Sequence, residues 1–341
     1  MCIVFIDLRN NTDYKCVLLS NRDQMLCRPT RETQFWTPDG LLSLSQDNHG
    51  LCIDDSSVRQ KCSKLVSKNQ STETPRILAG VDMVCCGTWL GMSTSGRLSL
   101  LTNRIELLEE CDSSKKPHGL HHQKEEDCIS RGNLPVEFLC GDSEPAEFLK
   151  QLDNSPRNYR HYNLIVGNGV DDLQFYSDAM PNRIVKLERG KIHGLSNASL
   201  NTPSFKVEKG KKMLENMRFP DPDKMAAAAS QCTDNRPSVE CRSLFRSMFE
   251  ILRDSEKQPC SEDHPCSHEY LCSSIYVERH VVPPANESDK RTDAERVYGT
   301  RSSAIILVDR KDRVTFYESG FEYGAKNKWM DQVFHWKLQP M

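Results

Sequence analysis

The chain begins with MCIVFIDL, residues 1–8, and this stretch gives the first indication of the fold. Cys2 through Ile6 form a short apolar run that contains β-branched residues, and Asp7 closes it. A run of this length is typical of a buried strand and is too short for a membrane-spanning helix. Charge also follows it too soon for a secretory signal. We therefore expect the start of the chain to lie in a sheet, with Cys2 either a small core residue or part of an active site.

The composition is that of a globular protein without a strongly charged surface. The chain has 341 residues, a formal net charge of −3 and a pI near 6.4. These values give no electrostatic case for binding nucleic acid or an anionic membrane surface. With a mean hydropathy of −0.61 and apolar runs of only strand length, we do not expect an integral membrane protein. The 15 cysteines are scattered and odd in number, which favours reduced thiols in the cytosol over a disulfide framework.

Three polar stretches, at about 54–76, 112–130 and 255–295, are predicted to be loop insertions in a single domain spanning 1–341. Strand patterns lie at both ends of the chain and helix patterns in the middle, which predicts an α+β fold. Ser238 and Thr202 are the expected N-caps of two of these helices. Near the C-terminus, residues 302–319 are predicted to form a hairpin.

The motif LLSNRDQ, residues 18–24, follows a predicted strand and places Arg22 and Asp23 at its mouth. After removal of Met1, the α-amino group of Cys2 would titrate near pH ~8 and could act as the base for the Cys2 thiol. Arg22 would favour the thiolate, and Asp23 could orient the amine. Cys2 and Asp23 are therefore predicted catalytic residues.

Three more polar residues lie at the ends of apolar runs. Asn103 ends a predicted strand, Asn197 follows a Gly-Leu-Ser segment, and Arg301 lies at the entrance of a buried strand. The amides of the two asparagines can donate hydrogen bonds to an oxyanion. Together with Arg301 they are predicted members of the same catalytic set. Turn capping by the asparagines and a surface ion pair of the arginine are the structural alternatives.

Seven motifs in order, MC, NRDQ, GTWLG, LLTN, YNLIVGN, GLSNASLNTP and YGTRSS, resemble the NRDE-domain family of transport-and-Golgi-organization proteins. The resemblance covers nearly the whole chain outside the polar stretches. It implies an N-terminal-nucleophile-hydrolase-like αββα sandwich, with two stacked, mainly antiparallel sheets flanked by helices. Distantly similar penicillin V acylases and bile-salt hydrolases attack amides with an N-terminal cysteine, and the positions of that kind here are Cys2, Arg22, Asp23, Asn103, Asn197 and Arg301. Gln24 replaces the glutamate of the NRDE motif and cannot act as a base.

The resemblance also implies a function, because members of this family are connected with haem trafficking. We expect a haem-binding and haem-trafficking protein that moves haem from storage organelles or membranes to haem-accepting proteins, with catalysis absent or vestigial. We expect it in the cytoplasm, associated with the Golgi, mitochondria or lysosome-related organelles. One alternative is an N-terminal cysteine amidohydrolase or thioesterase acting on acylated small molecules. Another is acyl-CoA or lipid binding linked to Golgi and mitochondrial homeostasis.

Haem as cargo requires an apolar wall and an axial ligand for the iron. The predicted ligand-binding residues are Cys2, Arg22, Asp23, Trp89, His193 and Arg301, with Trp89 as apolar lining and His193 as the best placed histidine. A separate segment suggests zinc by residue type, but its spacing does not match paired Cys-x-x-Cys knuckles: it contains Cys260, His264, Cys266, His268 and Cys272. We therefore predict no metal site and no catalytic metal.

Overall fold

The computed structural model describes residues 2–10, 13–37, 75–104, 130–155, 159, 161–178, 180, 182–258, 272–284, 291–323 and 327–339. Sheet A consists, in spatial order, of β10 (Ile192–Leu195), β1 (Ile3–Asp7), β2 (Tyr14–Met25), β12 (Val297–Asp309), β13 (Arg313–Glu322) and β14 (Lys328–Lys337), and β11 (His280–Val281) pairs with β12. Sheet B consists of β3 (Thr30–Trp36), β4 (Ile77–Asp82), β5 (Leu90–Ser93), β6 (Arg97–Asn103), β7 (Tyr162–Asn168), β8 (Leu173–Ser177) and β9 (Ile184–Lys186).

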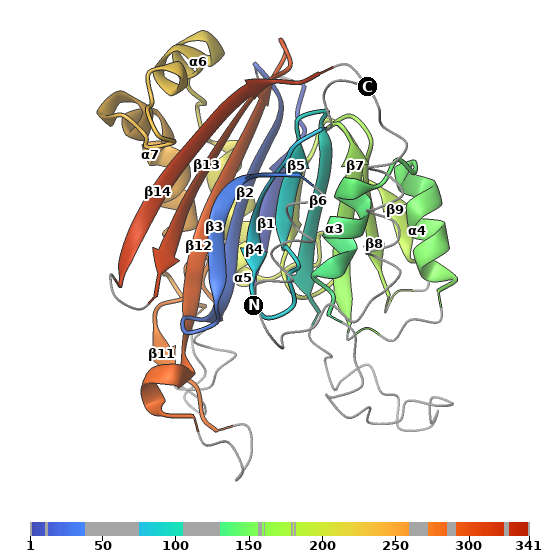
Figure 1. Cartoon of the computed structure of the whole chain (residues 1–341), viewed down its shortest axis with the longest axis vertical. Coiled ribbons are helices and arrows are strands. Elements are labelled where there is room, and N and C mark those ends of the chain that lie inside the picture. The colour runs from blue at the N-terminus through green and yellow to red at the C-terminus, as the bar shows by residue number, and fades with distance from the viewer. Residues whose placement is uncertain are drawn as a thin grey trace.

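The two sheets are stacked, and each is covered on its outer face by helices (Figure 1). Helices α5 (Phe205–Glu215), α6 (Pro222–Ser230) and α7 (Val239–Leu252) pack on sheet A, while α3 (Asn133–Cys140) and α4 (Pro145–Asp153) pack on sheet B. All strand pairings are antiparallel among the described residues. The predicted α+β class and the αββα sandwich of two stacked, mainly antiparallel sheets flanked by helices are therefore confirmed.

The first strand is buried on both faces, which explains its continuous apolar run. Val4 and Ile6 lie in the core between the two sheets. Ile3 and Phe5 point the other way, into the core between sheet A and the helices. Because both faces of the strand are buried, apolar residues occupy successive positions and do not alternate with polar ones.

The sequence predicted that strand β2 ends before the NRDQ motif. In the structure, this strand runs through the motif and ends at Met25. Strand β12 pairs with it over this whole length, and Tyr298 lies opposite Met25. The motif therefore lies inside a strand and not at its mouth. Alternation along the strand sends Asn21 toward the helices, where it donates to the carbonyl oxygens of Leu252 and Ile275, and sends Arg22 toward sheet B.

The predicted hairpin and one of the two predicted helix starts are confirmed. Strands β12 and β13 pair through residues 302–320, and the Ser238 hydroxyl accepts a hydrogen bond from the Cys241 amide at 3.1 Å. The prediction for Thr202 was wrong, since Ser204 is the N-cap of α5. Thr202 instead donates its amide to the Ser199 carbonyl, in the turn between β10 and α5.

The predicted insertions lie largely outside the described residues. The structure does not describe residues 54–74, 112–129, 259–271 and 285–290. That these residues are loop insertions in a single domain therefore stays a prediction. The described part of the third stretch contains β11 and a 3-10 turn, η3 (Asp293–Arg296). No helix in the described ranges has the length and apolar character needed to cross a membrane.

Candidate functional site

Arg22 is buried between the sheets, where strand β2 meets the edge of sheet B. Its Cζ atom lies 3.8 Å from the centre of the Trp89 ring. Its guanidinium donates to Asp82 Oδ2 and to Thr30 Oγ1, both at 3.3 Å, and Arg28 Nε also donates to Asp82 at 2.6 Å. Burial lowers the pKa of Arg22, whereas the charges of Asp82 and of a Cys2 thiolate act in the opposite direction.

Arg301 from β12 contributes a second buried guanidinium at this point. Only 5% of the surface of this residue is exposed. It donates to the carbonyl oxygens of Met25, at 3.3 Å, and Arg28. No carboxylate of the described residues forms an ion pair with it. Burial and the neighbouring charge of Arg22 lower its pKa to about 10, against a smaller opposing effect of Asp82. The two arginines thus form a buried pair of like charges.

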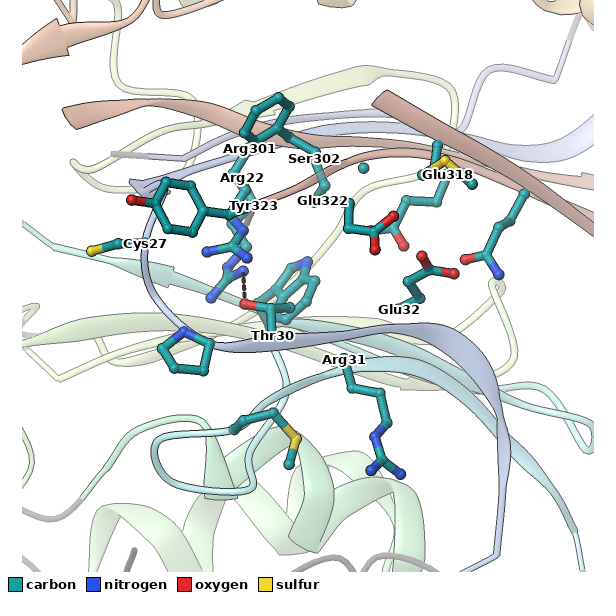
Figure 2. Close-up of a pocket in the computed structure, with 17 residues that line it drawn as sticks. Arg22, Cys27, Thr30, Arg31, Glu32, Arg301, Ser302, Glu318, Glu322 and Tyr323 are labelled. Atoms are coloured by element: carbon teal, nitrogen blue, oxygen red, sulfur yellow. Dashed lines mark hydrogen bonds between the residues drawn. The ribbon is translucent and has the colours of Figure 1, made fainter. Parts of the chain in front are cut away.

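A cavity of about 280 Å³ opens beside this pair. Strands of both sheets contribute to its wall, and Figure 2 shows the guanidinium groups at one end and acidic side chains, among them Glu32 and Glu318, at the other. Apolar lining comes from Met83, Trp89, Phe321 and Met330. Three of the predicted ligand-binding residues, Arg22, Trp89 and Arg301, are therefore brought together around one cavity.

Cys2, Asn103 and Asn197 gather at a neighbouring point, where strands β1, β6 and β10 end. The Ser196 hydroxyl donates to the Cys2 carbonyl oxygen at 3.0 Å. The Asn197 amide donates to the Asn103 carbonyl oxygen at 2.6 Å. Cys2 is buried and is not among the residues that line the cavity. It adjoins the cavity through Arg22, because Ile3 pairs with Asn21 and places Cys2 beside the Arg22 position.

Asp23 lies on the opposite face of β2 from Arg22, toward helix α5. Its Oδ1 accepts a hydrogen bond from the Thr300 hydroxyl at 2.7 Å, and its buried Oδ2 has no hydrogen-bond partner among the described residues. Burial raises the pKa of Asp23, although the charge of the N-terminal amine, the charge of Lys206 and the hydrogen bond from Thr300 act against this rise. Lys206 is itself buried and donates to the Cys272 carbonyl oxygen at 3.0 Å. Asp23 is thus separated from the cavity by its own strand.

Replacing Asp23 by asparagine should stabilise the protein at neutral pH by about 1 kcal/mol, because it removes a buried charge that is only half hydrogen-bonded. The folded-state pKa of Asp23 is raised, so the wild type loses stability as the pH rises from about 4, near the unfolded pKa, through the folded pKa. The asparagine variant has no such loss. Urea unfolding between about pH 4 and pH 7 should show the difference growing with pH, and a variant less stable at neutral pH would contradict this.

His193 is not part of the cavity wall. Its Nε2 lies 2.8 Å from the Glu188 carbonyl oxygen, and its Nδ1 lies 3.1 Å from the Asn201 amide nitrogen. With both ring nitrogens engaged in these contacts, we leave His193 out of the candidate site. Cys260, His264, Cys266 and His268 lie outside the described residues, and the described residues contain no group of three or more His, Cys, Asp or Glu placed to hold a metal ion.

Three residues of this region escaped the sequence analysis. Asp82 and Glu318 reach the site from segments about 60 and 296 positions away from Arg22, and no local pattern marks Glu318. Lys206 lies in the first turn of a lysine-rich helix, where a lysine is normally solvated. A signal existed only for Asp82, which closes the apolar run Ile77–Val81 in the way that Asp7 closes the first strand.

The family model described as Transport and Golgi organisation 2 matches residues 1–50 and 62–323. The chain is similar to the Transport and Golgi organization 2 homolog of Mus musculus and to the Transport and Golgi organization protein 2 homolog of Homo sapiens. Each is 25% identical over 353 aligned residues, which cover 99% of this chain and 100% of the relative. Among solved structures, the C2A mutant of a conjugated bile acid hydrolase from Clostridium perfringens is 13% identical, covers 99% of this chain and 97% of its own, and has a TM-score of 0.39. Because the family model matches nearly the whole chain, the protein belongs to the Transport and Golgi organisation 2 family.

Proposed function

We propose that the protein binds haem as cargo in the cavity beside Arg22 and Arg301 and passes it to haem-accepting proteins. The observation that supports this most directly is the buried pair of guanidinium groups, in which Arg301 has no ion-pair partner among the described residues. A buried charge without a partner is costly, so such a site favours a ligand with acidic groups. The two propionates of haem are acidic groups of this kind.

The apolar side of the cavity suits a flat aromatic ligand. Trp89 stacks on Arg22 and lines the cavity together with Met83, Phe321 and Met330. The volume of about 280 Å³ is near the lower limit of small-molecule sites, which span roughly 300–1,000 Å³. We therefore expect the propionate edge of haem to enter the cavity, with the rest of the ring lying at its mouth.

An axial ligand for the iron would come from the cavity wall and not from His193. Cysteine, methionine and tyrosine can all hold haem iron, and the wall contains Cys27, Met83, Tyr323 and Met330. Tyr323 is the most accessible of them, with 41% of its surface exposed.

Haemin titration followed by transfer to apomyoglobin tests this function. We expect a saturable shift of the Soret band at a one-to-one ratio, and haem should then move to apomyoglobin without being consumed. Trp89→Ala should weaken binding by removing the stacking surface, worth about 1–3 kcal/mol per aromatic ring in comparable stacks. Absence of any Soret change at micromolar protein would contradict the proposal.

The second candidate is an N-terminal cysteine amidohydrolase or thioesterase. It is favoured by the position of Cys2 beside Arg22, with Ser196 and Asn197 at the same point. The Cys2 thiolate would attack the acyl carbon, the amine or thiol would leave, and water would release the acid. Intact-mass analysis after exposure to acyl amides and thioesters distinguishes the two functions. An acyl adduct that Cys2→Ala abolishes, together with a flat haemin titration, would replace the carrier by the hydrolase.

Acyl-CoA binding is a third candidate, because its phosphates could occupy the same pair of arginines. Competition between haemin and an acyl-CoA in one titration distinguishes the ligands. The family name supports a link to the Golgi, and we place the exchange of cargo in the cytoplasm, at the surface of the Golgi, of mitochondria or of lysosome-related organelles. Cell fractionation tests this placement.

A further inference from the structure

Two pairs of like charges stand at opposite ends of the cavity, whose wall also includes Arg31 and Glu322. Arg22 and Arg301 come from neighbouring strands of sheet A and form the cationic end. Glu318 from β13 and Glu32 from β3 reach the other end from different sheets (Figure 2). The arginine pair and the glutamate pair are thus separated along the cavity.

Among the described residues, no cationic side chain forms a hydrogen bond or ion pair with the acidic end. Neither Glu32 nor Glu318 forms an ion pair within the part of the chain that the structure describes. Glu318 is buried and accepts a hydrogen bond from the Thr33 hydroxyl. Burial raises its pKa, the hydrogen bond from Thr33 and the charge of Arg22 lower it, and the charge of Glu32 raises it again. A positive centre placed beside these two carboxyl groups would relieve their repulsion.

We infer that the cavity selects a ligand that carries a positive centre apart from its acidic groups, which for a porphyrin cargo means a trivalent metal, as in ferric haem. This inference rests on the haem-binding function proposed above. The ring of a ferric porphyrin carries one net positive charge at the metal, whereas a divalent metal leaves the ring neutral. The propionates are identical in both, so they bind the arginine end equally well. The difference in affinity between the two therefore reports on the acidic end alone.

Gallium(III) and zinc(II) protoporphyrin IX provide this comparison without redox chemistry. Both have the same ring and the same propionates, and they differ in the charge at the centre. One unit of charge near two carboxyl groups is expected to give the wild type an affinity for the gallium complex about tenfold higher. Fluorescence or absorbance titration of each complex measures the ratio.

Two variants connect the ratio to the acidic end. Glu32→Gln and Glu318→Gln should each reduce the preference to about threefold or less, mainly by weakening binding of the gallium complex. Glu32 is exposed, so its replacement should not disturb folding. Glu215→Gln, on the exposed end of α5, is the matched control and should leave the ratio unchanged.

The outcomes separate this inference from the proposed function. Equal affinities of the wild type for both complexes would overturn the selectivity and leave haem binding in place. A tenfold ratio that persists in both glutamine variants would also overturn it, by assigning the preference to metal coordination. Failure of both complexes to bind would overturn haem binding itself.

Discussion

An Arg301→Gln variant is expected to bind haemin roughly 30- to 100-fold more weakly than the wild type. Arg301 is buried, and no carboxylate of the described residues forms an ion pair with it, so a propionate would gain a charge-assisted hydrogen bond from it. Glutamine is close in shape but brings no charge. Titration of the Soret band at fixed salt concentration measures the difference.

Two further variants show whether the loss comes from charge. Arg301→Lys keeps the charge but not the planar fork, so its affinity should lie between those of the wild type and the glutamine variant. Arg183→Gln removes a guanidinium from the surface, where Arg183 pairs with Asp153, and should leave affinity unchanged. Because Arg301 also donates to the carbonyl oxygens of Met25 and Arg28, urea midpoints must be compared. Unchanged haemin affinity in a folded Arg301→Gln variant would contradict the role of the pair.

Gly210→Ala should have the largest effect on stability, a loss of about 2–3 kcal/mol in the free energy of unfolding. Alanine is the better helix former by about 1 kcal/mol, but a Cβ atom at position 210 would lie 2.1 Å from Cζ of Phe5. Helix α5 packs directly on β1 at this glycine, and Phe5 is fully buried. Urea unfolding measures the loss.

The control and the rescue both follow from the same contact. A Cβ atom at Gly320 would meet nothing closer than 4.0 Å, so Gly320→Ala should be nearly neutral. Phe5→Leu should make room for alanine at position 210, and the double variant should lose less stability than the two single losses combined. If Gly210→Ala were as stable as the wild type, α5 could not lie as close to β1 as the structure has it.

The layers of the fold could be predicted because each is encoded locally. The apolar run at Ile3–Ile6, the capping serine at Ser238 and the hairpin at 302–319 each signal one element over a few residues. The end of β2 could not be predicted, because the polar residues Asn21–Gln24 read as a strand end. They remain in the strand only because β12 pairs with them.

Only the part of the site that lies in local sequence motifs could be predicted. Arg22, Trp89 and Arg301 lie in recognisable motifs, and the fold brings them together. Glu318 and Asp82 contribute through long-range pairing of strands, which no pattern in the chain records. His193 was singled out by residue type, yet its ring nitrogens contact Glu188 and Asn201. Residue type alone does not show which hydrogen bonds a buried side chain already makes.

The most direct test of the central claim compares haemin with its dimethyl ester. The two share iron and ring, but the ester lacks the acidic charges that the Arg22–Arg301 pair is proposed to bind. We predict that the wild type binds haemin at least about tenfold more tightly than the ester, and that Arg301→Gln largely removes this preference. Equal affinities of the wild type for haemin and the ester would contradict the account.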